Sequence, residues 1–167
     1  SMSIMNRLPS GCHQLDELLC GGLEKGVITQ LYGKAGCGKS NLAIAFAVSC
    51  LNKGDKVAYI DTDGLSIERV AQVARRNFTD IARNLYVWEV LDFDQQYSAV
   101  NNLGNVLEAD DRFSLVILDS ATGLYRMELS KDQGISPKQE LANQLSHLLG
   151  FARKYSISVL ITNQTYR

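Results

Sequence analysis

Short apolar stretches alternate along the chain with longer segments in which apolar and polar residues are mixed. Apolar stretches of strand length occupy residues 27–32, 57–61, 85–90, 115–119 and 157–162. Most lack polar alternation, as expected of strands that are buried on both faces of a sheet. The segments between them predict helices over 41–53, 67–76, 94–109 and 137–154 and a short helical turn over 80–84. This alternation predicts an α/β fold with three layers, in which helices flank a mainly parallel, twisted sheet of about five strands.

Residues typical of helix starts support these boundaries. Ser66 and Asp94 are predicted to cap the helices that follow them, and Ser136 followed by Pro137 combines a capping residue with proline at the first helical position. Residues 120–135 show no period and are predicted to form a long loop. That loop begins at the carboxyl end of a strand, where open α/β sheets bind their ligands.

Composition narrows the classes of protein that this chain can belong to. The chain has 167 residues and a net charge of −1, so it fits one domain and is not a polycation. Any binding of nucleic acid must therefore come from a local basic patch. No apolar run approaches the about 20 residues that cross a membrane. The four cysteines are scattered without a C-x-x-C pair, which predicts free thiols in a reducing cytoplasm rather than a zinc site. Residues 1–3 read as a tag remnant, which leaves 4–167 as the domain.

The candidate chemistry begins immediately after the first predicted strand. There the sequence reads G-x-x-x-x-G-K-S, with the residues Gly33, Lys34, Ala35, Gly36, Cys37, Gly38, Lys39 and Ser40. A strand before this motif and a helix after it are the context that a phosphate-binding P-loop requires. The alternative is a glycine-rich turn that binds nothing.

A P-loop assigns specific chemistry to these residues. Backbone N–H groups of the loop and of the helix start, including Asn41, point at the phosphates of a nucleotide such as ATP. Lys39 reaches the β- and γ-phosphates, and the hydroxyl of Ser40 holds Mg²⁺. Asp119 ends the apolar run 115–119, in the manner of the carboxylate that holds a water on that Mg²⁺. The alternative for Asp119 is a residue that caps a turn.

Together these motifs resemble the RecA/RadA recombinase family over nearly the whole chain. The matching segments are 10–19 and 21–26 before the P-loop, 28–33 leading into it, and then Y-I-D-T at 59–62, L-D-S at 118–120 and I-T-N-Q at 161–164. Within that family the chain is most similar to an archaeal paralogue that lacks the N-terminal DNA-binding domain. The resemblance implies a RecA-like ATPase core that uses ATP and Mg²⁺.

The resemblance also implies roles for individual residues. Gln164 matches a glutamine that senses the γ-phosphate, and Arg69 matches, across a gap of one residue, an arginine that stacks on adenine. A solvated arginine on a helix face is the alternative for Arg69. Asp63 stands where recombinases have the glutamate that polarises the attacking water, and its carboxylate is one methylene shorter. Hydrolysis is therefore expected to be slow. Glu68 is an alternative base, although it is expected on the helix surface.

The predicted loop over 120–135 matches the first DNA-facing loop of recombinases. It contains Arg126 and Lys131, which can contact phosphates, and Tyr125, which can stack on a base. The same loop also contains Glu128 and Asp132, so a solvated loop is the alternative. We expect DNA binding to be weak, salt-sensitive and directed to single strands.

The resemblance implies a weakly hydrolysing regulator of homologous recombination and DNA repair. Its implied partners are the main recombinase and a Holliday-junction resolvase. A homo-oligomer is compatible with the sequence, but long autonomous filaments are not expected, because no phenylalanine-based polymerisation motif precedes the core. The alternatives are a KaiC-like or helicase-type ATPase and a nucleotide-gated interaction module.

The same analogy predicts the order of the strands in the sheet. Named by their ranges, the strands are expected in the order 27–32, 157–162, 115–119, 57–61 and 85–90, with the P-loop strand at an edge. In recombinases further strands follow the glutamine and cover that edge. Because the sequence ends at Arg167, shortly after Gln164, we expect the core over 4–167 to lack its C-terminal strands.

Overall fold

The computed structural model describes residues 7–8, 22–34, 36–129 and 136–165. The strands are β1 (Arg7–Leu8), β2 (Leu23–Glu24), β3 (Ile28–Gly33), β4 (Lys56–Asp61), β5 (Leu85–Glu89), β6 (Phe113–Asp119) and β7 (Ser158–Gln164). The helices are α3 (Lys39–Asn52), α4 (Ser66–Ala74), the 3₁₀ turn η1 (Arg75–Asn77), α5 (Phe78–Ala82), α6 (Phe93–Ala109), α7 (Gly123–Glu128) and α8 (Pro137–Tyr155). No helix in these ranges is long and apolar enough to cross a membrane.

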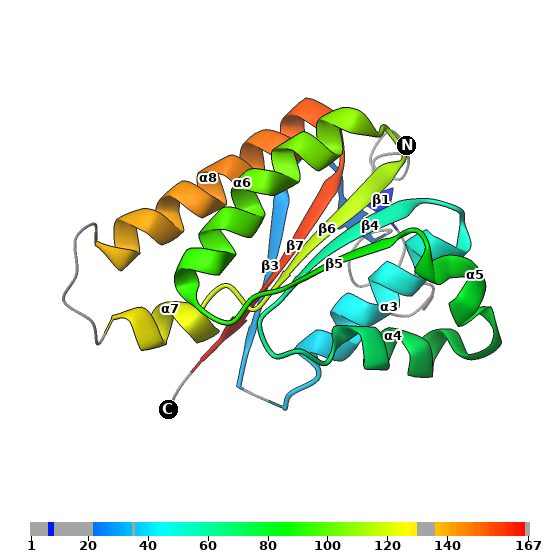
Figure 1. Ribbon diagram of the computed structural model, residues 1–167, viewed down its shortest axis with the longest axis horizontal. Coiled ribbons are helices and arrows are strands. Elements are labelled where there is room, and N and C mark those ends of the chain that lie inside the picture. The colour runs from blue at the N-terminus through cyan, green and yellow to red at the C-terminus, as the bar shows by residue number, and fades with distance from the viewer. Residues whose placement is uncertain (1–6, 9–21, 35, 130–135, 166–167) are drawn as a thin grey trace.

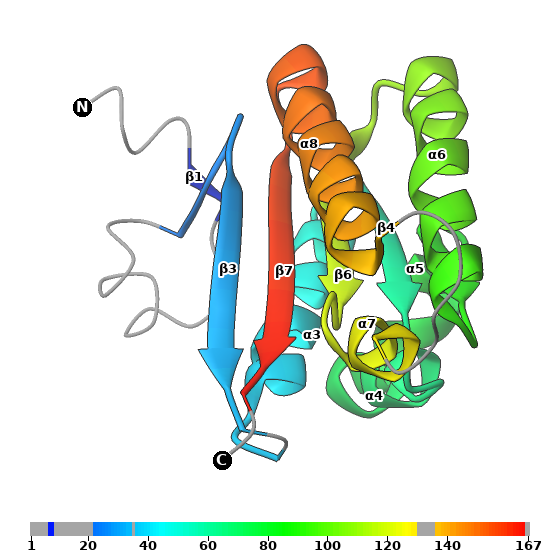
Figure 2. The ribbon, with the colours of Figure 1, turned by 90° about the vertical axis from the view of Figure 1, so that its left-hand side faces the viewer.

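The centre of the molecule is a five-stranded sheet in which all neighbouring strands run parallel. The strand order is β3-β7-β6-β4-β5, which confirms the predicted order and the position of the P-loop strand at an edge. Strands β1 and β2 form a separate antiparallel pair, which the sequence pattern did not predict. Figure 2 shows β1 beside β3.

Helices cover both faces of the sheet, so the predicted three layers are confirmed (Figures 1 and 2). Helices α6, α7 and α8 lie on one face, and α3, α4 and α5 lie on the other. Side chains of the central strands alternate between the two cores. On β4, for example, Ala58 and Ile60 belong to the core under α6 and α8, whereas Val57 and Tyr59 belong to the core under α3. The central strands β4, β6 and β7 are buried almost throughout, as the apolar runs predicted.

Several of the predicted helix starts and caps differ in detail. Helix α3 begins at Lys39 rather than Asn41, and α5 begins at Phe78 rather than after Asp80. Helix α6 begins at Phe93 because Asp92, not Asp94, is the cap, and its carboxylate accepts a hydrogen bond from the N–H of Gln95 at 2.8 Å. Ser66 is the first residue of α4 rather than its cap. At α8, Pro137 is the first helical residue as predicted, but the side chain of Ser136 makes no capping hydrogen bond.

The segment predicted as a long loop over 120–135 contains a helix. Residues Gly123–Glu128 form α7, and Leu124 of this helix is buried against the core under α6 and α8. The prediction of a continuous loop was therefore wrong for this half of the segment. The other half, 130–135, lies outside the described residues.

The parallel strands bring their carboxyl ends to one edge of the sheet. In register, Gly33 on β3 stands opposite Gln164 on β7. Asp119 on β6 stands between Asp61 on β4 and Thr162 on β7. Residues far apart in sequence are thus placed side by side at the point where the P-loop leaves β3.

Candidate nucleotide-binding site

The P-loop connects the end of β3 to the start of α3. Gly36 and Gly38 have φ angles of 82° and 97°, a backbone conformation that strains any residue with a side chain. At Gly33 a Cβ atom would lie 2.4 Å from Sγ of Cys37, so the Cys37 side chain would have to shift to admit any larger residue. The loop geometry therefore depends on glycine at positions 36 and 38 of the motif.

Lys39 lies across the loop and is only 8 % exposed. Its Nζ donates hydrogen bonds to the carbonyl oxygens of Gly33 at 2.7 Å and Lys34 at 2.8 Å. The ammonium group is therefore held at the mouth of the loop, beside the N-terminus of a 14-residue helix. A helix N-terminus and a fixed ammonium group both favour a bound anion.

Ser40 and Asp119, the two residues that the sequence predicts to hold Mg²⁺, meet across the site. The Ser40 hydroxyl donates to Oδ2 of Asp119 at 2.8 Å. The hydroxyl of Tyr59 donates to the same oxygen at 2.7 Å, and the hydroxyl of Thr162 donates to Oδ1 at 2.6 Å. Asp119 is nearly buried, and hydroxyl groups from α3, β4 and β7 together fix its carboxylate.

The end of β4 contributes two carboxylates with different roles. Asp61 is buried and accepts hydrogen bonds from the N–H groups of Asp63, Gly64 and Ser66. Burial opposes its ionisation, but the hydrogen bonds from Ser66 and Asp63 outweigh burial and lower the pKa of Asp61. Asp61 therefore takes over the capping of α4 that was predicted for Ser66.

Asp63 is the more exposed of the two carboxylates and faces the cleft. Its Oδ1 accepts a hydrogen bond from the N–H of Leu65 at 3.1 Å, and its Oδ2 pairs with Nη1 of Arg69 at 3.3 Å. Partial burial and the neighbouring Asp61 raise the pKa of Asp63, while Arg69 acts in the opposite sense. Glu68 is exposed on α4 and does not line the cleft.

These groups surround a cleft of about 290 Å³. The residues that line it are Gly36, Gly38, Lys39, Ser40, Asn41, Asp63, Arg69, Asp119 and Gln164. The structure therefore brings most of the predicted nucleotide and metal residues together, from the P-loop to the end of β7. Gly33, Lys34 and Cys37 belong to the loop but do not line the cleft, and Ala35 lies outside the described residues.

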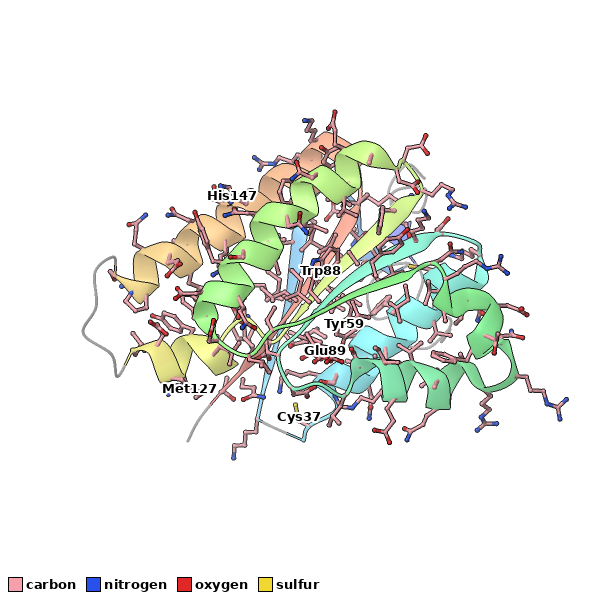
Figure 3. All side chains as sticks on the ribbon, in the orientation of Figure 1. Cys37, Tyr59, Trp88, Glu89, Met127 and His147 are labelled. Atoms are coloured by element: carbon pink, nitrogen blue, oxygen red, sulfur yellow. The ribbon has the colours of Figure 1, made fainter. Side chains whose placement is uncertain are left out.

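A larger cavity of about 690 Å³ lies between β5 and the first turns of α6. Its lining includes Trp88, Glu89 and Asp92 but no residue of the P-loop. Figure 3 shows Trp88 and Glu89 away from Cys37, which lies in the loop before α3. The smaller cleft is the candidate nucleotide site because the phosphate-binding groups converge there.

Of the residues predicted to contact DNA, those that the structure describes do not line the cleft. Arg126 is exposed on α7, and Lys131 lies outside the described residues. The ring of Tyr125 packs against Phe93, with 5.8 Å between the ring centroids, so it faces the core under α6 and α8. The structure thus places Tyr125 in a packing role.

Sequence reasoning missed the groups that hold Asp119 in place. Tyr59 and Thr162 belong to motifs shared with the family, but nothing in the sequence alone assigned them a role. Asp61 was not predicted to cap α4. Their contacts depend on strand register, which a linear pattern does not contain. The sequence did contain one signal for these contacts, because Thr162 is a polar residue near the end of an otherwise apolar strand.

A P-loop between the edge strand β3 and helix α3, beside a parallel sheet in the order β3-β7-β6-β4-β5, is typical of a RecA-like P-loop core. A family model described as Rad51 matches residues 2–167, so the chain belongs to the Rad51 family. As predicted, it is therefore a RecA/RadA paralogue.

Particular relatives resemble the chain over nearly its full length. It is 44% identical over 165 residues to the DNA repair and recombination protein RadB of Methanococcoides burtonii, covering 98% of this chain and 72% of the relative. It is 44% identical over 162 residues to the protein of the same name from Methanoculleus marisnigri, covering 96% of this chain and 71% of the relative. The protein of this name from Halobacterium salinarum is 40% identical over 163 residues, covering 95% of this chain and 68% of the relative.

Proposed function

We propose that this protein binds ATP with Mg²⁺ in the P-loop cleft and acts in DNA repair and recombination as a weakly hydrolysing paralogue of the recombinases. The observation that carries the proposal is the convergence of Lys39, Ser40 and Asp119 on one cleft. A fixed ammonium group and a helix N-terminus suit the phosphates of a nucleoside triphosphate, and a hydroxyl–carboxylate pair suits its metal ion. The names of the RadB relatives supply the biological process.

The residues of the cleft fit Mg²⁺ as the metal. Within the described ranges, no group of three or more His, Cys, Asp or Glu side chains could hold a metal ion without help. Mg²⁺ suits such a site because it is bound through one or two protein oxygens together with substrate phosphates and waters. Ser40 and Asp119 would hold it, and the bound ion would supply charge neutralisation on the phosphate oxygens.

The adenosine end of the nucleotide is assigned to Arg69 and the γ-phosphate end to Gln164, which both line the cleft. Arg69 presents a planar guanidinium suited to stacking on adenine. Gln164 carries an amide that can donate to a phosphate oxygen, and its backbone N–H donates to the hydroxyl of Thr122 at 2.9 Å. That hydrogen bond joins the end of β7 to the residue before α7, so the state of the γ-phosphate can reach the segment that carries Arg126.

Slow hydrolysis follows from the surroundings of Asp63. As a water-positioning group Asp63 has a short side chain, and both of its oxygens are already engaged, one by Leu65 and the other by Arg69. A carboxylate held in this way is a poor base for an attacking water as long as Arg69 remains paired with it. We therefore expect turnover far below the typical enzyme value of about 10 s⁻¹.

We also propose that the protein binds DNA, the main recombinase and a Holliday-junction resolvase. Arg126 and Lys131 are the candidate contacts to DNA phosphates. Since they are few, the affinity for single-stranded DNA should be low and should fall steeply with salt.

The deciding experiment is a steady-state ATPase assay with and without single-stranded DNA, run beside a DNA-binding titration across a salt series. ATP binding with turnover well below 10 s⁻¹ and weak, salt-sensitive DNA binding supports the proposal. A robust turnover near that value without DNA would favour the KaiC-like or helicase-type alternative. ATP binding without any DNA binding would favour the nucleotide-gated interaction module.

A further inference from the structure

The carboxylate of Asp119 is held by two hydroxyl groups that lie outside the nucleotide cleft. Tyr59 donates to Oδ2 at 2.7 Å and Thr162 donates to Oδ1 at 2.6 Å. Ser40 also donates to Oδ2, at 2.8 Å, but Ser40 lines the cleft and is expected to serve the metal. Each oxygen of Asp119 thus has one hydroxyl partner that does not line the cleft.

Tyr59 and Thr162 are completely buried, with 0 % exposure each. Tyr59 lies on β4 in the core under α3, and Figure 3 shows it between the sheet and that helix. Neither side chain lines the cleft, so neither is a candidate for direct contact with a nucleotide.

We infer that Tyr59 and Thr162 are positioning residues that fix Asp119 for the metal ion of the bound nucleotide. The inference rests on the proposed function. When the Ser40 oxygen turns to a cation, the other two hydroxyls still hold Oδ1 and Oδ2. Asp119 then keeps its orientation without reorganising, because its partners come from the strands on both sides of it, β4 and β7. Hydrogen-bonding partners of ligating carboxylates typically change metal affinity 10- to 100-fold when they are removed.

The test separates metal positioning from simple packing. Purified wild type, Tyr59→Phe, Thr162→Val and Thr162→Ser are titrated with ATP over a series of Mg²⁺ concentrations and also with excess chelator, and thermal unfolding is recorded without nucleotide. Tyr86→Phe is the matched control. It removes a tyrosine hydroxyl from the neighbouring strand β5, where that oxygen accepts a hydrogen bond from Lys56.

The expected result is a selective dependence on Mg²⁺. Tyr59→Phe and Thr162→Val should raise the Mg²⁺ concentration needed for half-maximal enhancement of ATP binding by about 10- to 100-fold. Their affinity for ATP in chelator should stay at the wild-type value. Thr162→Ser, which keeps the hydroxyl, and Tyr86→Phe should titrate as wild type does.

Two results would overturn the inference. One is a folded Tyr59→Phe or Thr162→Val protein with a lowered unfolding temperature but an unchanged Mg²⁺ dependence, which would assign these hydroxyls to packing alone. The other is an equal loss of ATP affinity with and without Mg²⁺. If Tyr59→Phe does not fold, Thr162→Val tests the same claim on the other oxygen of Asp119. Failure of the wild type to bind ATP with Mg²⁺ is a separate result, which rejects the proposed function itself.

Discussion

Replacing Asp63 by glutamate tests whether this residue positions the attacking water. The native carboxylate ends a short side chain beside the cleft and is held by Leu65 and Arg69. Asp63→Glu extends the carboxylate by about one carbon–carbon bond, roughly 1.5 Å. Misplacement of a catalytic group by about 1 Å costs on the order of 10²-fold in rate, so the longer side chain can raise kcat by up to about 100-fold.

The same substitution has a small cost in stability. It removes the hydrogen bond from the N–H of Leu65, and a typical hydrogen bond contributes about 0.5–1.5 kcal/mol. The Asp63 side chain is 46 % exposed, so water replaces much of that interaction and we expect a loss of about 0.5 kcal/mol. A gain in turnover would therefore occur despite a slightly less stable fold.

The assay is steady-state ATP hydrolysis at saturating ATP and Mg²⁺, with ATP affinity measured separately so that binding and turnover are distinguished. Glu68→Gln is the control, because Glu68 is exposed on the same helix as Arg69 and does not line the cleft. A kcat for Asp63→Glu at or below the wild-type value, with ATP binding intact, would refute the assignment of Asp63 as the shortened base.

Three further results follow from the structure. Alkylation of the exposed Cys37 should weaken ATP binding, because its Sγ lies 3.5 Å from Nζ of Lys39 and a bulky adduct would displace that group. Cys50, whose pKa burial raises to about 11, should stay unmodified in the folded protein, as peptide mapping would show. Unchanged ATP binding after complete alkylation of Cys37 would contradict the site. Arg69→Ala should weaken ATP binding by about 0.5–2 kcal/mol, or roughly 2- to 30-fold, in calorimetry, and Arg69→Lys should not restore it if stacking is the cause. Hydrogen bonding to Lys56 lowers the pKa of Asp110 in the folded protein. The pair therefore stabilises the fold fully above the ordinary carboxyl pKa of about 4. This stabilisation is lost as the pH falls through the lower pKa that Asp110 has in the folded protein. The difference in urea midpoint between wild type and Lys56→Met should therefore shrink in acid, and a difference that stays constant from pH 7 to pH 3 would show that the charge pair is not its source.

The sequence predicted those parts of the site that lie in one contiguous stretch or at a strand end. The P-loop is contiguous, so its contacts follow from local backbone geometry at Gly36, Gly38 and Lys39. Asp119 was proposed because it stands at the carboxyl end of an apolar run, and parallel strands bring such ends together. Gln164 was proposed from the resemblance to the family rather than from the pattern. The strand order came from analogy with the family rather than from the pattern.

Other features depend on three-dimensional context. The hydroxyl of Tyr59 reaches Asp119 only because β4 and β6 are neighbours in one register, and a buried tyrosine in an apolar strand looks like packing. The choice of Asp92 over Asp94 as a cap depends on where the chain turns after β5, which capping preferences alone do not distinguish. Helix α7 was missed because six residues are too few to show a helical period.

The most direct measurement is a calorimetric titration of the wild type and of Lys39→Ala with ATP in Mg²⁺. Wild type should bind the nucleotide. Lys39→Ala, verified as folded by circular dichroism, should lose at least about 1.5–3 kcal/mol, or roughly 10- to 150-fold in affinity, because it lacks the ammonium group that we propose contacts the phosphates. Absence of binding by the wild type, or equal binding by both proteins, would contradict the assignment of this cleft.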